Sequence, residues 1–241
     1  MKKLFAIIAF LVLIPSMAAA GMLLGSGVED ASSGLSKTSL VAWYDFGDAT
    51  DAHASYDLTE VGSPSYTRGT PNYGTSVQST GAQWNSPAST GIISAWGGAA
   101  VDCTFGIRFK TGASVSSGDY ILKHPNIRFA VRSLTGGSTV FINSASSHDT
   151  GYTFTSGTWY SLVAVRDATT GNVQVYINNN DTGYTVCSNG WNDAVVTFGG
   201  AASAAEDIDI DYMFFYNREL TSDEVAWIYN SGGTRTYADL D

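Results

Sequence analysis

Apolar and polar residues alternate in short runs along most of the chain, and polar turn residues separate the runs. The clearest run is residues 104–110, in which every second side chain from Phe105 to Phe109 is aromatic or aliphatic. Arg108 and Lys110 fall between them and therefore on the opposite face of an extended chain. A two-residue period of this kind predicts a half-buried β-strand.

Similar runs recur at short spacing, with clusters of Gly, Asn, Asp, Ser or Thr between them. We expect strands at residues 40–46, 56–61, 76–84, 104–110, 120–123, 127–132, 139–143, 159–166, 173–178, 183–186, 195–198 and 208–216. The polar segment 167–172 predicts a turn that joins its two flanking strands into a hairpin. Many short strands without helical repeats between them indicate an all-β sandwich or barrel.

One short helix is expected near the C-terminus. Thr221 and Glu224 have the spacing of a capping box, in which each side chain accepts a hydrogen bond from a free amide of the first turn. Val225 and Ile228 give the helix an apolar face, and Gly232 follows as a stop signal. So short a helix needs to pack against the strands to be stable.

Composition narrows the functional class. The chain has 241 residues, of which 14% are charged, and a formal net charge of −10. Phosphate neutralisation requires clustered Lys and Arg, and no basic stripe occurs in the sequence. We therefore expect no nucleic-acid partner and no attraction to anionic lipid.

The N-terminal residues have the pattern of an export signal. Lys2 and Lys3 precede the apolar run 4–14, and small residues end the segment at Ala20. The sequence predicts a signal peptide at 1–20, with an uncleaved membrane anchor as the alternative. We expect a flexible linker at 21–38, a sandwich domain at 39–231 and a C-terminal tail at 232–241, in a protein that is secreted or displayed on a cell or virion surface.

Two cysteines, Cys103 and Cys187, are present. Export to an oxidising compartment favours one disulfide between them, and two buried thiols are the alternative.

Four stretches, in this order, resemble the laminin G-like jelly roll of the concanavalin A-like lectin and glucanase superfamily. They are residues 40–46, 104–109, the pair 159–165 and 175–178, and 210–225, the last with the sequence IDYMFFYNRELTSDEV. The resemblance implies a two-sheet antiparallel jelly-roll β-sandwich with one short C-terminal helix. The chain departs from the family at Asn179, where a Gly is usual.

The superfamily includes lectins and glycan-binding modules as well as enzymes, so the fold leaves the function open. Our leading hypothesis is a recognition module without catalytic activity that binds carbohydrate or another surface polymer through its loops. Aromatic side chains in or beside polar loops are the candidate ligand contacts, because sugar rings pack on them. They are Trp96, Trp191, Trp84 and Tyr73. The alternative is a structural or adhesive protein of a virion or cell envelope, with protein partners.

A glycoside hydrolase is the second alternative. Asp207, Asp209 and Asp211 would project from one face of a strand, and retaining hydrolases need two carboxylates about 5 Å apart. This hypothesis requires that the row line an open cleft and that no Arg or Lys pair with its carboxylates.

The resemblance also implies a structural calcium ion between the opening loop and the closing strand. Asp48, Asp51 and Asp211 are the candidate ligands, since hard cations bind clustered oxygens. The alternative for the loop residues is that they form turns through their own backbone hydrogen bonds.

Overall fold

The computed structural model describes residues 34–61, 65–68, 75–80, 83–85, 101–111, 119–123, 128–134, 137–143, 147–155, 157–186, 196–198 and 207–241. Nearly all of the regular structure in these ranges is β-strand, and every strand pair is antiparallel.

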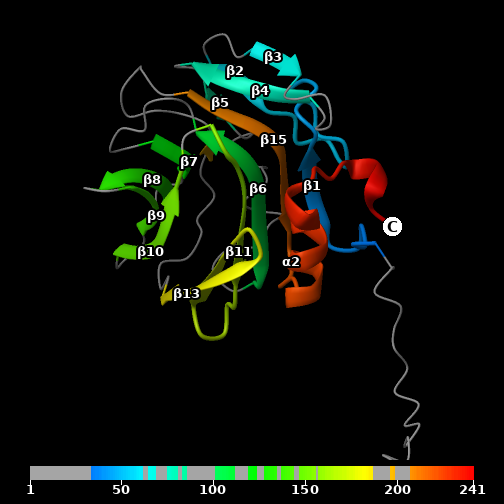
Figure 1. Cartoon of the computed structure of the whole chain (residues 1–241). Helices are drawn as coiled ribbons and strands as arrows, with labels where there is room; N and C mark the ends of the chain where they lie inside the picture. Colours follow the sequence, from blue (N-terminus) through cyan, green and yellow to red (C-terminus); the bar gives the residue numbers. More distant parts are fainter. Residues whose placement is uncertain are drawn as a thin grey trace, which may run out of the picture. The chain divides into compact units, whose positions relative to one another are not determined.

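The strands form two sheets (Figure 1). The first sheet has eight strands. Seven of them follow the order β13 (Asn180–Val186), β12 (Asn172–Ile177), β11 (Trp159–Arg166), β6 (Cys103–Thr111), β15 (Asp207–Tyr216), β4 (Thr75–Thr80) and β3 (Ser65–Arg68). The eighth, β1 (Leu40–Tyr44), lies off this path and pairs with β15. The second, of seven strands, has the order β10 (Ser147–Phe154), β9 (Gly137–Asn143), β8 (Arg128–Leu134), β7 (Asp119–Lys123), β14 (Thr197–Phe198), β5 (Gln83–Asn85), β2 (Thr59–Val61). The predicted antiparallel sandwich with one short helix is confirmed.

The main core lies between the two sheets. Phe105, Ile107 and Phe109 of β6 are fully buried in it, as their two-residue period predicts. Alternate residues of β12, in the same sheet, also lie in this core. Leu122 and Phe198 enter it from the seven-stranded sheet. The eight-stranded sheet therefore has an inner face toward this core and an outer face away from it.

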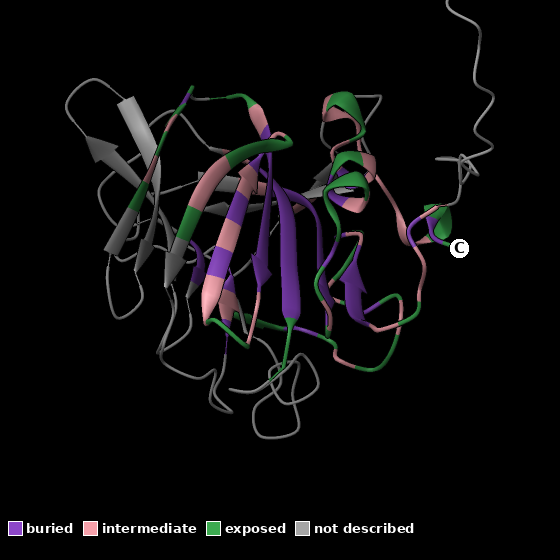
Figure 2. Ribbon diagram, turned by 90° about the horizontal axis from the view of Figure 1, so that it is seen from below, coloured by how far each residue is buried: buried purple, intermediate pink, exposed green. Residues whose placement is uncertain are grey.

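A second apolar cluster covers part of the outer face. The helix α2 (Ser222–Tyr229) contributes Val225 and Ile228 to it, and the sheet contributes a stack of rings. The Trp43 ring lies 5.2 Å from that of Phe214 and 5.6 Å from that of Tyr212, centroid to centroid. Strands under this cluster are buried on both faces (Figure 2).

Gly106 makes room for this stack. A Cβ atom at Gly106 would lie 2.0 Å from a ring carbon of Phe214. The close approach of the ring to the β6 backbone therefore requires glycine at this position.

The capping box predicted for α2 is present. The Thr221 hydroxyl accepts a hydrogen bond from the Glu224 amide, and the Glu224 carboxylate accepts one from the Thr221 amide at 2.8 Å. The helix ends earlier than the glycine signal suggests, because Asn230 takes up the left-handed conformation, which Asn tolerates better than most residues. Two short 3₁₀ turns follow, η1 (Asn230–Gly232) and η2 (Tyr237–Asp239).

The predicted turn 167–172 joins β11 and β12, and a second hairpin joins β12 to β13. The two turn residues of the β12–β13 hairpin, Asn178 and Asn179, both have positive φ, at 50° and 62°. This is the geometry of a tight hairpin turn, so Asn179 occupies the left-handed position where the family usually has Gly.

The segments next to both ends of the domain differ from the predicted linker and tail. The Asp241 amide donates to the Leu35 carbonyl at 3.1 Å, and the Lys37 amide donates to the Asp241 carbonyl at 2.9 Å. Leu35 and Leu240 are both buried in the second cluster. Residues 34–38 and 232–241 are thus part of the packed domain, because each segment contributes one buried leucine to the second cluster.

The predicted strand 76–84 is also wrong in its extent. It is two strands, β4 and β5, which belong to different sheets. Within the described part of the chain, no helix is long and apolar enough to cross a membrane.

Candidate functional site

The outer face of the eight-stranded sheet is open over β12 and β13. Val173, Val175 and Ile177 of β12 point into the main core, so the residues between them point outward. These outward residues, Asn172, Gln174 and Tyr176, are only partly buried. We call this region the open part of the outer face, and the region under α2 the covered part.

A groove with a volume of about 250 Å³ lies in the open part. Its lining residues are Val165, Asp167, Asn172, Gln174, Tyr176, Tyr184, Glu219 and Leu220. Tyr184 is directly opposite Gln174 in the β12–β13 pairing, so the two side chains share the outer face. At 58% exposure, Tyr184 is the most exposed of the large hydrophobic side chains in the described ranges.

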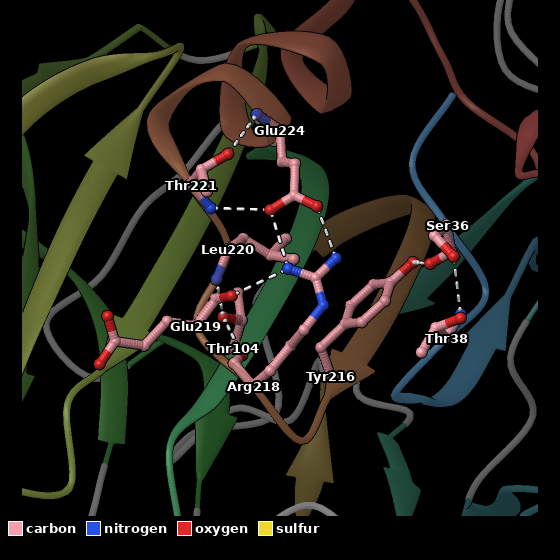
Figure 3. A network of polar contacts seen from close by, with 9 residues as sticks. All are labelled: Ser36, Thr38, Thr104, Tyr216, Arg218, Glu219, Leu220, Thr221 and Glu224. Atoms are coloured by element: carbon pink, nitrogen blue, oxygen red, sulfur yellow. Dashed lines mark hydrogen bonds and ion pairs between the residues drawn. The ribbon is translucent and has the colours of Figure 1, made fainter. Parts of the chain in front are cut away.

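The wall of the groove next to α2 is held rigidly (Figure 3). The Thr104 hydroxyl donates to the Arg218 carbonyl at 2.8 Å and accepts from the Leu220 amide at 3.1 Å. The Arg218 guanidinium forms a bidentate ion pair with Glu224, at 2.8 and 2.5 Å. Glu219 lies between these anchors, and its side chain points away from the ion pair (Figure 3).

Three carboxylates gather at this wall. Asp102, Asp167 and Glu219 each offer an oxygen within 4.8 Å of the others. Asp167 also organises its turn, since it accepts hydrogen bonds from the Thr169 amide at 2.7 Å and the Thr170 hydroxyl at 2.6 Å.

The pKa values of Glu219 and Asp167 are shifted in opposite directions. Partial burial, and then the charges of Asp102 and Asp167, raise the pKa of the Glu219 carboxyl. The hydrogen bond from Thr170 lowers the pKa of Asp167. The groove wall is therefore negatively charged, and its oxygens can bind a hard cation or accept hydrogen bonds.

The chemistry of the groove suits a polar ligand with one apolar face. Tyrosine rings offer flat apolar surface, and the amides of Asn172 and Gln174 can both donate and accept hydrogen bonds. Half of the lining residues are acids or amides, so a ligand of this groove must itself be rich in polar groups.

The structure describes one of the four aromatic residues predicted as ligand contacts. Trp96, Trp191 and Tyr73 are outside the described residues. Trp84 is in β5, where it is paired with Phe198 of β14 and Glu60 of β2, so its backbone is in a sheet and not in a loop. Their role as ligand contacts stays a prediction.

The predicted calcium ligands are not brought together as one group of three oxygens in the part of the chain that the structure describes. The Asp51 carboxylate accepts hydrogen bonds from four backbone amides of its own loop and of β1, between 3.0 and 3.2 Å. Asp48 is exposed and accepts from the Thr50 amide at 2.8 Å. Both have the turn-forming role that was the alternative, and calcium binding stays a prediction.

The acidic row of β15 does not meet the condition set for a hydrolase. Asp211 forms an ion pair with Arg108 at 2.6 Å, and both side chains are 2% exposed. Asp209 forms an ion pair with Lys110. A β-bulge between Ile210 and Tyr212 shifts the alternation of β15, so Ile210 faces the main core and Tyr212 faces the second cluster. The Asp207 side chain is outside the described part.

The structure describes one of the two cysteines predicted to form a disulfide. Cys103 is buried in the main core, and Cys187 lies outside the described residues. The disulfide stays a prediction.

The groove residues were missed in the sequence because they lie in strands rather than loops. The sequence of β12 did contain one signal. Its inward positions are all β-branched, so the alternation places one Tyr among the polar residues of the outward face. Glu219 had no signal, because its approach to Asp167 depends on the fold.

The fold and the groove define a β-sandwich domain with a polar, tyrosine-lined groove on one sheet. A model of the concanavalin A-like lectin/glucanases superfamily, of the laminin G-like type, matches residues 99–226. The chain belongs to this superfamily. No curated protein sequence matches it significantly.

Solved structures are similar at low sequence identity. Domain 4 of AbnA, a GH43 extracellular arabinanase from Geobacillus stearothermophilus, in complex with arabinotriose, has a TM-score of 0.60 and 18% identity; the match covers 78% of this chain and 96% of that one. The binding domain of Paraclostridial Mosquitocidal Protein 1 has a TM-score of 0.66 and 14% identity, covering 81% and 53%. The binding domain of botulinum neurotoxin DC, in complex with rat synaptotagmin II, has a TM-score of 0.63 and 13% identity, covering 81% and 52%. The present chain thus spans about half the length of the toxin binding domains. At these identities the likeness establishes the fold alone.

Proposed function

We propose that this protein is a carbohydrate-binding module that holds its ligand in the groove of the open part. The observation that carries the proposal is the exposed Tyr184 beside Tyr176, in a groove that also contains two amide side chains. An exposed tyrosine ring is a suitable platform for the C–H face of a sugar, and its hydroxyl can form a hydrogen bond with the same ligand.

The solved structures support a binding role. AbnA domain 4 was crystallised with arabinotriose, and the toxin structures are of binding domains. The proposal transfers only the chemical class of ligand, a saccharide, and not the particular sugar.

Binding without hydrolysis is part of the proposal. A retaining hydrolase needs one carboxylate free to attack and another free to protonate the leaving group. Asp209 and Asp211 are both engaged by cations of β6, and Asp211 is buried. A buried carboxylate that is paired in this way has no access to a glycosidic bond.

We further propose that the protein acts outside the cell or on its surface, as the apolar segment at 4–14 predicts. A structural calcium ion bound by Asp48, Asp51 and Asp211 stays a prediction, and the experiment below tests it.

A glycan array probed with the full chain tests the proposal, once with calcium and once with excess chelator. We expect selective binding to a small set of saccharides. Loss of binding in chelator, with the fold intact by circular dichroism, would support the calcium prediction.

Tyr184→Ala, applied to the same array, assigns the site. We expect this variant to lose the array signal at unchanged melting temperature, since the Tyr184 ring is mostly solvated. Val61→Ala is the matched control, because Val61 is 41% exposed on the seven-stranded sheet. Binding that survives Tyr184→Ala would contradict the groove as the site. Silence of a folded protein on the array would favour the structural or adhesive alternative.

A further inference from the structure

We propose that the groove selects saccharides that carry a protonated amine, and that this amine lies against Glu219. The inference rests on the proposed function and adds the ligand class to it. Neutral sugars would bind more weakly in the same groove, and sugars that carry carboxylates would be excluded.

The charge of the groove is the first observation. Its lining contains Asp167 and Glu219 and no Lys, Arg or His. Asp102 adds a third carboxylate at the same wall, with oxygens within 4.8 Å. An anionic sugar would meet like charges here, whereas an ammonium group would meet a complementary potential.

The state of Glu219 is the second observation. Its carboxylate makes no hydrogen bond or ion pair with any residue in the described ranges, whereas Asp102 accepts from the Ala168 amide at 2.8 Å and Asp167 accepts from its own turn. Glu219 is therefore the carboxylate of the three with both oxygens available to a ligand. Its backbone is fixed on both sides, since Thr104 is hydrogen-bonded to Arg218 and Leu220.

The size and lining of the groove are the third observation. A volume of about 250 Å³ suits one sugar ring with its substituents. The two tyrosines line the β12–β13 side, and Glu219 lines the side next to α2. A ring lying on Tyr184 would thus direct one substituent toward the carboxylates, where an ammonium donates hydrogen bonds and a hydroxyl or acetamide gains less.

Isothermal titration of the full chain tests this inference, at about pH 6, where the amine of the ligand is protonated. The ligands are oligomers of glucosamine, of N-acetylglucosamine and of galacturonate, all in excess chelator. We expect the glucosamine oligomer to bind roughly tenfold more tightly than the acetylated one, which corresponds to one charge-assisted hydrogen bond. The galacturonate oligomer should not bind.

Two variants separate the carboxylate from the overall negative charge of the protein. Glu219→Gln should remove the preference for the amine and leave the affinity for the acetylated oligomer within about twofold. Asp223→Asn removes the same charge from an exposed position on α2 that does not line the groove, and it should keep the preference. Trilysine is the control for charge alone and should bind weakly.

The outcomes distinguish the two proposals. Equal affinities for the amine and the acetylated oligomer, or a preference that persists in Glu219→Gln, would overturn this inference and leave the carbohydrate-binding proposal standing. Trilysine binding as tight as that of glucosamine would overturn it as well. Failure of every saccharide here and on the array would overturn both proposals.

Discussion

The covered and open parts of the eight-stranded sheet use the same residue types for different purposes. In the covered part, Tyr212 and Tyr216 are fully buried in the second cluster, and the Trp43 ring stacks on that of Tyr212. In the open part, Tyr176 packs against the edge of the second cluster and stays half-buried, Tyr184 is exposed, and both line a groove. We therefore expect a tyrosine in this sheet to stabilise the fold where the second cluster buries it, and to be available to a ligand where its ring stays exposed.

The ion pair of Arg108 and Asp211 at the edge of the covered part gives the largest expected effect. Arg108→Met should lower the free energy of unfolding by about 3–5 kcal/mol, because it leaves a buried carboxylate without its partner. The double variant Arg108→Met with Asp211→Leu should recover most of this loss in urea denaturation. A single variant of wild-type stability would show that the pair is not buried as described.

Gly106 gives the next largest effect. Gly106→Ala should cost about 2–3 kcal/mol, since the new methyl group would displace the Phe214 ring from the covered stack. Gln174→Ala, in the open part, should change stability by less than about 0.5 kcal/mol. Thermal unfolding measures both, and similar values for the two variants would remove the distinction between the parts.

A matched pair of Tyr→Phe variants compares the parts directly. The Tyr212 hydroxyl donates to the Ile228 carbonyl of α2 at 3.2 Å, so Tyr212→Phe should cost about 1 kcal/mol. Tyr184→Phe should leave stability unchanged, because its hydroxyl has no hydrogen-bond partner in the described ranges. Urea denaturation of both variants is the measurement, and an equal loss in each would contradict the comparison.

The pH dependence of stability gives the smallest effect. Burial raises the pKa of Asp45 above 3.8 in the folded state, although it accepts hydrogen bonds from the Trp43 indole at 2.7 Å and the Tyr237 amide at 3.1 Å. A raised carboxyl pKa means that the folded state binds the proton more tightly than the unfolded state does. Its contribution to stability is therefore present below the unfolded pKa and is lost as pH rises through the folded pKa.

Asp45→Asn should reduce the decline in the free energy of unfolding with rising pH above about pH 4. The Asn side chain still accepts a hydrogen bond through its amide oxygen but does not titrate. Unfolding at a series of pH values measures the slope. Asp223→Asn is the control, since Asp223 is exposed, and its slope should match that of the wild type. An unchanged slope in Asp45→Asn would contradict the assignment.

Much of the fold was predictable because its strands alternate cleanly. The inward face of β6 and the capping box of α2 both follow from local sequence. The strands β3 and β10 were not predicted, since their sequences, SYTR and SHDTGYTF, are mostly polar. The division of 76–84 into two strands was missed because only pairing in space assigns β4 and β5 to different sheets.

The candidate site was less predictable than the fold. Exposed aromatics were sought in loops, whereas Tyr176 and Tyr184 lie on strands whose outer face is left open. Whether a strand residue is covered depends on where α2 packs, and that is a tertiary contact. The approach of Glu219 to Asp102 joins segments that are far apart in sequence, so no local pattern contains it.

Chemical-shift mapping with a saccharide identified on the array tests the central claim most directly. We predict that titration shifts the backbone amides of Gln174, Tyr176, Tyr184 and Glu219, while those of Trp43 and Phe214 in the covered part stay in place. Shifts confined to residues outside the groove, such as Trp96 and Trp191, would place the ligand in the loops and contradict the account.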